Sequence, residues 1–182
     1  TQIMREISFS KAIELAYYGA TILHPKTIQP LLRKSIPLYV KSFINPDAEG
    51  SVVKAIDVKD EESVACYIFK DDQILINLSS KDFSFIVESH LSSIFAILAA
   101  AKVQINVMQN SAISFSFCAN YDERKFTSLI PQLTELFNIE IVKNLTLITL
   151  HNYKEKELPG ILNNKEILIE QHSKNVVQYV YR

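Results

Sequence analysis

The 182-residue sequence is poor in glycine and carries almost no excess charge of either sign. Its three glycines, Gly19, Gly50 and Gly160, stand far apart, so there is no glycine-rich loop to hold the phosphates of a nucleotide. Its 19 basic and 20 acidic residues give a formal net charge of −1, without the basic patch typical of proteins that bind nucleic acids or anionic membranes. We therefore expect neither nucleic-acid binding nor phosphoryl transfer by this chain alone.

Cysteine and long apolar runs are scarce as well. The two cysteines, Cys66 and Cys118, each lie in an apolar stretch, which favours small buried side chains in a reducing compartment over a disulfide scaffold. The longest apolar run, residues 94–101, is far too short to cross a bilayer, and no secretory signal opens the sequence. We expect a soluble, cytoplasmic protein without membrane contact. No cysteine or carboxylate stands at metal-ligand spacing from His151 or His172, so no metal site is predicted.

The first fifty residues carry helix and turn signals in close succession. Ser10 is predicted to cap a helix over residues 11–18, which Gly19 ends. Pro25 is predicted to begin the next helix, because its fixed φ and missing N–H suit the first helical position. The stretch LYVK is typical of a strand, and NPDAEGS of a turn.

A regular pattern follows, after a strand and a turn predicted from CYIFKDD. ILINLSS, VQINVMQNS, AISFSFCAN and IEIVKN are typical of strands. Among these, VQINVMQNS should direct Val103, Ile105 and Val107 to one side, and AISFSFCAN should do the same with Ile113, Phe115 and Phe117. Two stripes at helical spacing lie between them. Their residues are Leu91, Ile94, Phe95 and Leu98 in the first stripe, and Phe126, Leu129, Ile130, Leu133 and Phe137 in the second.

The resulting order is strand, helix, strand, strand, helix, strand, the ferredoxin-like βαββαβ unit of an α+β fold. Pro131 conflicts with the second helix, so we expect either a kink there or a helix that starts near it. A weaker copy begins at Leu145, where LTLITLHN, KEILIEQHS and NVVQYVYR resemble three of the earlier strands. Its first connection is short and contains Pro159 and Gly160, so no full helix is expected there. The sequence thus predicts tandem modules, the second abbreviated.

Residues 7–53, which read ISFSKAIELAYYGATILHPKTIQPLLRKSIPLYVKSFINPDAEGSVV, resemble the end of the catalytic domain of aspartate kinases, or aspartokinases. The two modules that follow resemble the ACT regulatory domains of the same family. The resemblance implies a C-terminal remnant of the kinase domain at 1–53, a first ACT-like domain with a lead-in strand at 54–144, and an abbreviated second one at 145–182. It implies a parent enzyme that phosphorylates L-aspartate with ATP and magnesium, for the synthesis of lysine, threonine and methionine. The catalytic motifs would lie upstream of Thr1, so this chain would hold no catalytic residue and no cofactor.

In this family an amino acid made by the pathway binds where paired modules meet, often across a homodimer, and inhibits the kinase. A zwitterionic ligand needs donors and acceptors, which a helix start and a strand edge supply. The resemblance therefore places the effector site in the loop before the first module helix, Val87–Leu91, and in the second strand, Ile105–Ser111, with contributions from the copy. The predicted effector-binding residues are Ser89, His90, Leu91, Ile105, Asn106, Asn110, Ser111, Gln171 and Ser173.

Several assignments stay open from the sequence. His90 could cap the helix or contact the ligand, and Asn106 and Ser111 could merely satisfy strand ends. The effector could be lysine or threonine. Asn106 and Ala112 stand where lysine-regulated members often have carboxylates, which favours threonine. Lys41 lies in a loop that resembles one near the family's nucleotide pocket, but it is equally compatible with a solvated lysine at a strand end.

Two other functions compete with an effector-binding region of an aspartokinase. The chain could be a purely structural dimerisation module that holds kinase subunits together and binds no effector. It could also be a standalone amino-acid sensor, which the kinase-like segment at 1–53 disfavours. The sequence does not decide whether the parent enzyme is fused to a dehydrogenase.

Overall fold

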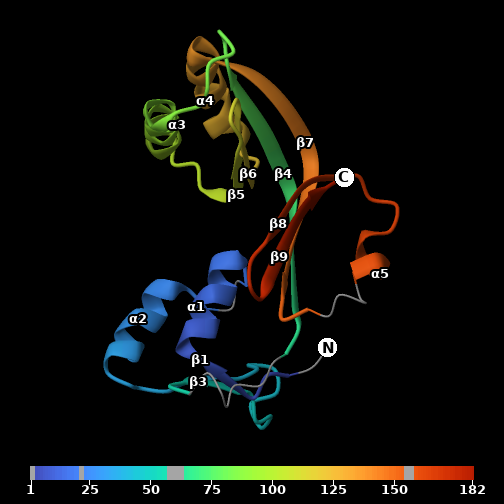
Figure 1. The fold of residues 1–182 in the computed structure, drawn as a ribbon. Coiled ribbons are helices and arrows are strands. Elements are labelled where there is room, and N and C mark those ends of the chain that lie inside the picture. The colour runs from blue at the N-terminus through green and yellow to red at the C-terminus, as the bar shows by residue number, and fades with distance from the viewer. Residues whose placement is uncertain (1–2, 21–22, 57–63, 154–157) are drawn as a thin grey trace. The chain divides into compact units, whose positions relative to one another are not determined.

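The structure, a computed structural model, describes most of the chain, in the ranges 3–20, 23–56, 64–153 and 158–182. These residues fall into two compact units (Figure 1). The first contains the described residues up to Ile68, together with 151–153, where the chain returns to it. The second contains the described residues from Phe69 to Leu150 and from 158 to the C-terminus.

The first unit joins a three-stranded sheet to two helices. In their pairing order the strands are β1 (Glu6–Ser8), β3 (Ser51–Lys54) and β2 (Leu38–Val40). The first pair is parallel and the second antiparallel. The helices are α1 (Phe9–Tyr18) and α2 (Pro25–Arg33). The helix start at Pro25 and the strand in LYVK are both confirmed. The buried core residues are Phe9, Ala12, Ile28 and Val53.

Helix α1 is capped by Ser8, and the cap predicted at Ser10 is wrong. The chain leaves β1 in extended conformation at Ser8, whose hydroxyl accepts the Lys11 backbone N–H over 3.1 Å. Ser10 already lies in the first turn, because strand and helix join without a loop. The end at Gly19 is confirmed: its φ of 117° is left-handed, and its N–H bonds to carbonyls of the last turn.

Replacing Ser8 by alanine should destabilise the first unit by about 1 kcal/mol, because the cap is lost from α1. Ser10→Ala is the matched control. Ser10 does not cap the helix, and its hydroxyl lies 3.0 Å from that of Ser8, so the loss of this single contact should change the free energy of unfolding by less than about 0.5 kcal/mol. Urea unfolding followed by circular dichroism measures both variants. A larger loss for Ser10→Ala than for Ser8→Ala would contradict this assignment of the cap.

The second unit is built on a six-stranded sheet whose strands pair in the order β5, β6, β4, β7, β9, β8 (Figure 1). The strands are β4 (Cys66–Ser80), β5 (Ile105–Asn110), β6 (Ser114–Asn120), β7 (Phe137–His151), β8 (Ile167–His172) and β9 (Val176–Tyr181). The first residues of β4 and the last residue of β7 belong to the first unit. The helices are α3 (Glu88–Ala100), α4 (Glu123–Leu136) and the short α5 (Leu158–Leu162).

The predicted order β4, α3, β5, β6, α4, β7 is confirmed, and so is the α+β class. Phe115 and Phe117 lie in the core that α3 and α4 form on one face of the sheet, as predicted. The two helical stripes contribute to the same core through Ile94, Leu98, Phe126, Leu129 and Leu133. Ile113 departs from the prediction, because it precedes β6 and is 51% exposed.

Strand β4 does not turn where a turn was predicted. CYIFKDD continues directly into ILINLSS, so that β4 has 15 residues, and β7 has 15 as well. Asp72 in β4 and Asn144 in β7 have φ of 53° and 59°. Aspartate and asparagine tolerate this left-handed backbone better than most residues, so each strand can change its local geometry without ending.

A bulge in β5 overturns the predicted alternation. Val103 and Ile105 pack against the core under α3 and α4, but Val107 packs in a second cluster with Leu75 and Cys118. The register shifts between Ile105 and Val107. One extra residue in a bulged strand reverses which side chains face each side, and simple alternation cannot anticipate it.

Pro131 lies inside α4, which begins at Glu123. The expectation that the helix starts near Pro131 is therefore wrong. Leu129 and Leu133 are fully buried on either side of the proline, so tertiary packing holds the helix across the position where a hydrogen bond is lost. Among the described residues, no helix is long and apolar enough to cross a membrane.

The internal copy is visible in the second hairpin. β8 and β9 carry the bulge found in β5 and β6, with a register shift between Ile167 and Ile169. The turn repeats too: the Ser111 N–H donates to the Ser114 carbonyl over 2.8 Å, and the Ser173 N–H to the Val176 carbonyl over 2.8 Å. Where no full helix was expected, the five residues of α5 form a short one.

Candidate functional site

The start of α3 meets the turn between β5 and β6. The Ile86 N–H donates to the Ala112 carbonyl over 2.9 Å, which ties the segment before the helix to the tip of the hairpin. Because α3 begins at Glu88, the predicted residues Ser89, His90 and Leu91 form its first turn instead of a loop before it. The predicted residues of α3 and those of the hairpin turn are thus brought together.

His90 caps the helix. Its Nδ1 accepts the Val87 N–H over 3.3 Å, and its ring packs edge-on against Phe137 with 5.9 Å between centroids. The same N-terminal turn offers the positive end of a helix dipole, which favours a carboxylate. A ligand contact by His90 stays a prediction.

The polar residues of the hairpin turn are occupied by the turn itself. The Ser111 hydroxyl lies 2.7 Å from that of Ser114 and accepts the Ser114 N–H over 3.1 Å. The Asn110 amide, with its nitrogen facing the turn, donates to the carbonyls of Ser111 and Ser114 over 3.2 Å each. Both side chains therefore satisfy a strand end.

Asn106 lies in the bulge of β5, within a network of polar side chains. Its amide nitrogen donates to Gln73 Oε1 over 2.7 Å and to Asn120 Oδ1 over 2.8 Å. Its oxygen accepts the ammonium of Lys70 over 3.0 Å. The Gln73 amide in turn donates to Asn120 over 2.8 Å, and the Cys118 thiol lies 3.6 Å from Gln73 Oε1. The bulge thus creates a polar cluster on the sheet that the sequence pattern did not predict.

Burial sets the electrostatics of this network. It lowers the pKa of Lys70, against a smaller opposing effect of Cys118. Burial also raises the pKa of Cys118 to about 12, against a smaller opposing effect of Lys70. Cys118 therefore stays a neutral thiol at physiological pH, and it acts as a weak donor and not as a nucleophile.

The copy lacks this network. Leu168 follows Ile167 in the second bulge as Asn106 follows Ile105 in the first. Leu168 packs in the apolar cluster with Leu145 and Val180. The same hairpin and bulge therefore form with apolar residues, so the polar side chains of the first module are not required by its backbone.

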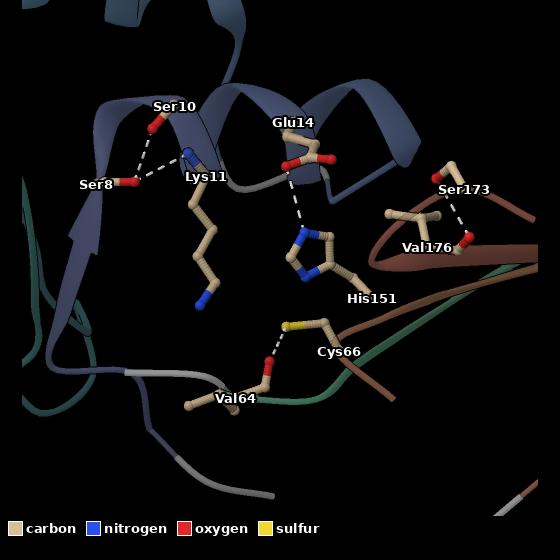
Figure 2. Close-up of polar contacts among 9 residues, drawn as sticks. All are labelled: Ser8, Ser10, Lys11, Glu14, Val64, Cys66, His151, Ser173 and Val176. Carbon is tan, nitrogen blue, oxygen red and sulfur yellow. Dashed lines mark hydrogen bonds and ion pairs between the residues drawn. The ribbon is translucent and has the colours of Figure 1, made fainter. Parts of the chain in front are cut away.

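Gln171 and Ser173 lie far from the other predicted residues. They belong to β8 and its turn, at one edge of the sheet, whereas β5 forms the opposite edge and four strands separate the two. Ser173 donates through its hydroxyl to the Val176 carbonyl over 3.3 Å (Figure 2). Within one chain the structure does not bring the two groups together.

Lys41 lies in the first unit, exposed after β2. Its ammonium donates to the Pro46 carbonyl over 3.3 Å and so supports the NPDAEG turn. A role in nucleotide binding stays a prediction. In the described part of the chain, no three histidine, cysteine, aspartate or glutamate side chains gather in a way that could hold a metal ion.

Sequence reasoning missed a polar cluster in the first unit (Figure 2). His151, the last residue of β7, places Nε2 3.3 Å from Oε2 of Glu14 on α1. Cys66, the first residue of β4, donates to the Val64 carbonyl over 3.6 Å, and the nearby Lys11 is buried. Burial raises the pKa of Cys66, opposed by the charge of Lys11. Glu14 and His151 are separated by 137 positions, so no local pattern could have paired them.

Two curated relatives align with most of the chain. The bifunctional aspartokinase/homoserine dehydrogenase of Haemophilus influenzae is 28% identical over 172 residues, which cover 88% of this chain and 21% of the relative. The lysine-sensitive aspartokinase 3 of Escherichia coli is 28% identical over 152 residues, 80% of this chain and 33% of the relative. The chain thus spans between a fifth and a third of the length of these relatives. No family model matches it.

Several solved aspartokinase structures have a fold similar to that of this chain. Aspartate kinase from Clostridium acetobutylicum superposes with a TM-score of 0.80 at 20% identity, over 100% of this chain and 46% of that one. E. coli aspartokinase III in complex with lysine and aspartate superposes with a TM-score of 0.75 at 24% identity, over 99% of this chain and 43% of that one. A putative C-terminal regulatory domain of aspartate kinase from Porphyromonas gingivalis superposes with a TM-score of 0.55 at 13% identity, over 65% of this chain and 86% of that one.

The chain is similar in sequence to aspartokinases and similar in fold to solved aspartokinases, including a putative C-terminal regulatory domain. The resemblance to aspartokinases, predicted from residues 7–53 and from the repeat that follows, is thereby confirmed. At these identities the solved aspartokinase structures bear on the fold alone.

Proposed function

We propose that this chain is the allosteric regulatory region of an aspartokinase, built from tandem ACT modules that follow the end of the kinase domain. The observation that carries the proposal is the alignment of 88% of the chain with an aspartokinase relative. The parent enzyme would phosphorylate L-aspartate with ATP and magnesium, held by residues upstream of this chain. The region itself would be inactive and would inhibit the kinase when an amino acid made by the pathway binds.

The effector site of this proposal lies at the start of α3 and along β5. The helix start can receive the carboxylate of an amino acid, because its dipole favours negative charge. The edge strand β5 offers backbone groups for the ammonium. Gln171 and Ser173 lie at the opposite edge of the sheet, so they could complete the site only from a second copy of the chain. The proposal therefore includes a homodimer.

Two effectors are compatible with this site. E. coli aspartokinase 3 is named lysine-sensitive, and aspartokinase III of the same organism has been solved with lysine and aspartate. In this chain Asn106 already accepts the ammonium of Lys70, and Ala112 offers no carboxylate. A second side-chain ammonium would therefore meet no negative partner at Asn106 or Ala112, which favours threonine over lysine.

The test is a calorimetric titration of the purified chain with lysine, threonine and methionine, separately and in pairs. We expect saturable binding of one amino acid, weakened about tenfold by Asn106→Ala, since a lost hydrogen bond to a charged group is worth about 1.5 kcal/mol. Asn45→Ala is the matched control. Asn45 is exposed in the turn after β2, in the first unit and outside α3 and β5, so this variant should bind with wild-type affinity.

The alternative is a structural dimerisation module that binds no effector. It is favoured by the polar side chains of Asn106, Asn110 and Ser111, all of which already have partners within the chain. A stable dimer by light scattering, with no heat from any of the three amino acids, would establish this reading and exclude the allosteric one.

A further inference from the structure

We propose that the contact between His151 and Glu14 couples strand β7 to helix α1, and so transmits the state of the effector-binding sheet to the kinase-like segment. The contact itself needs only the geometry of the first unit. The effector that would drive it rests on the proposed function.

The chain path makes His151 suited to this role. β7 is a central strand of the six-stranded sheet, yet its last residue, His151, belongs to the first unit. β4, its neighbour in the sheet, likewise has its first residues, from Cys66 to Ile68, in the first unit. Two adjacent strands of the sheet thus continue into the unit that contains α1. His151 follows Leu150 of the sheet directly in the chain, so β7 ends at the contact with Glu14.

The chemistry of the pair is specific. A carboxylate only accepts, so Nε2 of His151 carries the proton that it donates to Glu14. The side chain of His151 is nearly buried, with 7% of its surface exposed, whereas the side chain of Glu14 is 44% exposed. Within the described residues, Nδ1 of His151 is buried without a hydrogen-bond partner. Within the described residues, Nε2 is thus the ring nitrogen that a hydrogen bond holds, and it is held by Glu14.

Glu14 connects the contact to a surface. Together with Ser10, Ile13 and Tyr17 of α1, it lines a groove of about 910 Å³ in the first unit. Lys11 lies one turn before Glu14 on the same helix and is buried, and the charge of Lys11 acts on the thiol of Cys66. In Figure 2 the side chains of Lys11 and Glu14 extend from α1 toward Cys66 and His151. Glu14 is therefore the residue that the contact with β7 and the groove have in common.

The experiment is amide hydrogen exchange on the whole 182-residue chain, comparing the wild type with Glu14→Ala and His151→Phe. Alanine is chosen because a glutamine at position 14 could still accept the proton of His151 Nε2. Without any amino acid added, Glu14→Ala should raise exchange in the last residues of β7, from Leu147 onward, about tenfold, because the end of the strand is no longer held. At a saturating concentration of whichever of lysine, threonine and methionine binds, the wild type should show altered exchange in α1, and both variants should lose this response while binding remains saturable. Glu6→Ala is the matched control. It makes the same change in an exposed pair with Lys54, and should leave both readouts as in the wild type.

Each outcome decides the inference. Unchanged β7 exchange in Glu14→Ala, or an α1 response that survives in both variants, overturns the coupling while leaving effector binding intact. If no amino acid binds, the proposed function fails, and the coupling is then judged by the effector-free exchange of β7 alone. Elevated β7 exchange in Glu14→Ala, with Glu6→Ala at wild-type rates, supports the coupling.

Discussion

Phe117→Ala should lower the free energy of unfolding of the second unit by about 3–5 kcal/mol. Phe117 is fully buried in β6, within the core that α3 and α4 close over the sheet. Its ring also packs against that of Phe115, with 6.2 Å between centroids. Removing the ring loses its transfer free energy and leaves a cavity that the rigid sheet cannot close. Urea unfolding followed by circular dichroism measures the loss.

Phe85→Ala is the matched control for this substitution. Phe85 precedes α3 in the same unit but is 68% exposed, so the same change of side chain should alter the free energy of unfolding by less than about 0.5 kcal/mol. Equal losses in the two variants would mean that the core does not lie where the structure places it. A loss of only 1 kcal/mol for Phe117→Ala would mean that the sheet relaxes into the cavity.

The sequence predicted the elements whose residues repeat with a regular period. Leu129 and Leu133 follow helical spacing and are buried, and Phe115 and Phe117 follow strand spacing and share one core. These predictions hold because burial of one face dictates the spacing of apolar residues along the element. Local conformational rules also predicted the helix end at Gly19 and the helix start at Pro25 correctly, because each depends on a single residue's own φ.

Features that depend on the partner strand were not predictable from the period. The bulge at Asn106 is a mismatch between β5 and β6, and it moves Val107 to the other face. The continuity of β4 through Asp72 depends on its neighbours in the sheet, which hold the strand together across a left-handed residue. The cap at Ser8 depends on β1 entering α1 without a loop.

Some features of the candidate site could be predicted from the sequence, and others depend on the fold. The segment before α3 bonds to the tip of the first hairpin through Ile86 and Ala112, so the start of α3 lies beside that turn. An effector site there stays a prediction. Gln171 was assigned to the same seam, yet its edge of the sheet is the opposite one, since strand order is not written in local sequence. The contact of Glu14 with His151 joins residues near the two ends of the chain, and only the fold brings them together.

Gly50→Ala should destabilise the first unit by about 2–4 kcal/mol, because two costs add at this position. The φ of Gly50 is +72°, where an L side chain is strained. A Cβ there would also lie 2.3 Å from the Val40 carbonyl oxygen, a backbone atom that cannot rotate away. Because Val40 pairs with Ser51 in the sheet, relief of the clash would have to separate β2 from β3.

Gly160→Ala is the matched control: nothing lies within 4 Å of its added Cβ, and its place in α5 favours alanine by about 0.5–1 kcal/mol. Urea unfolding of the two variants should therefore give shifts of opposite sign, and a Gly50→Ala protein as stable as the wild type would show that the turn before β3 can adopt another backbone.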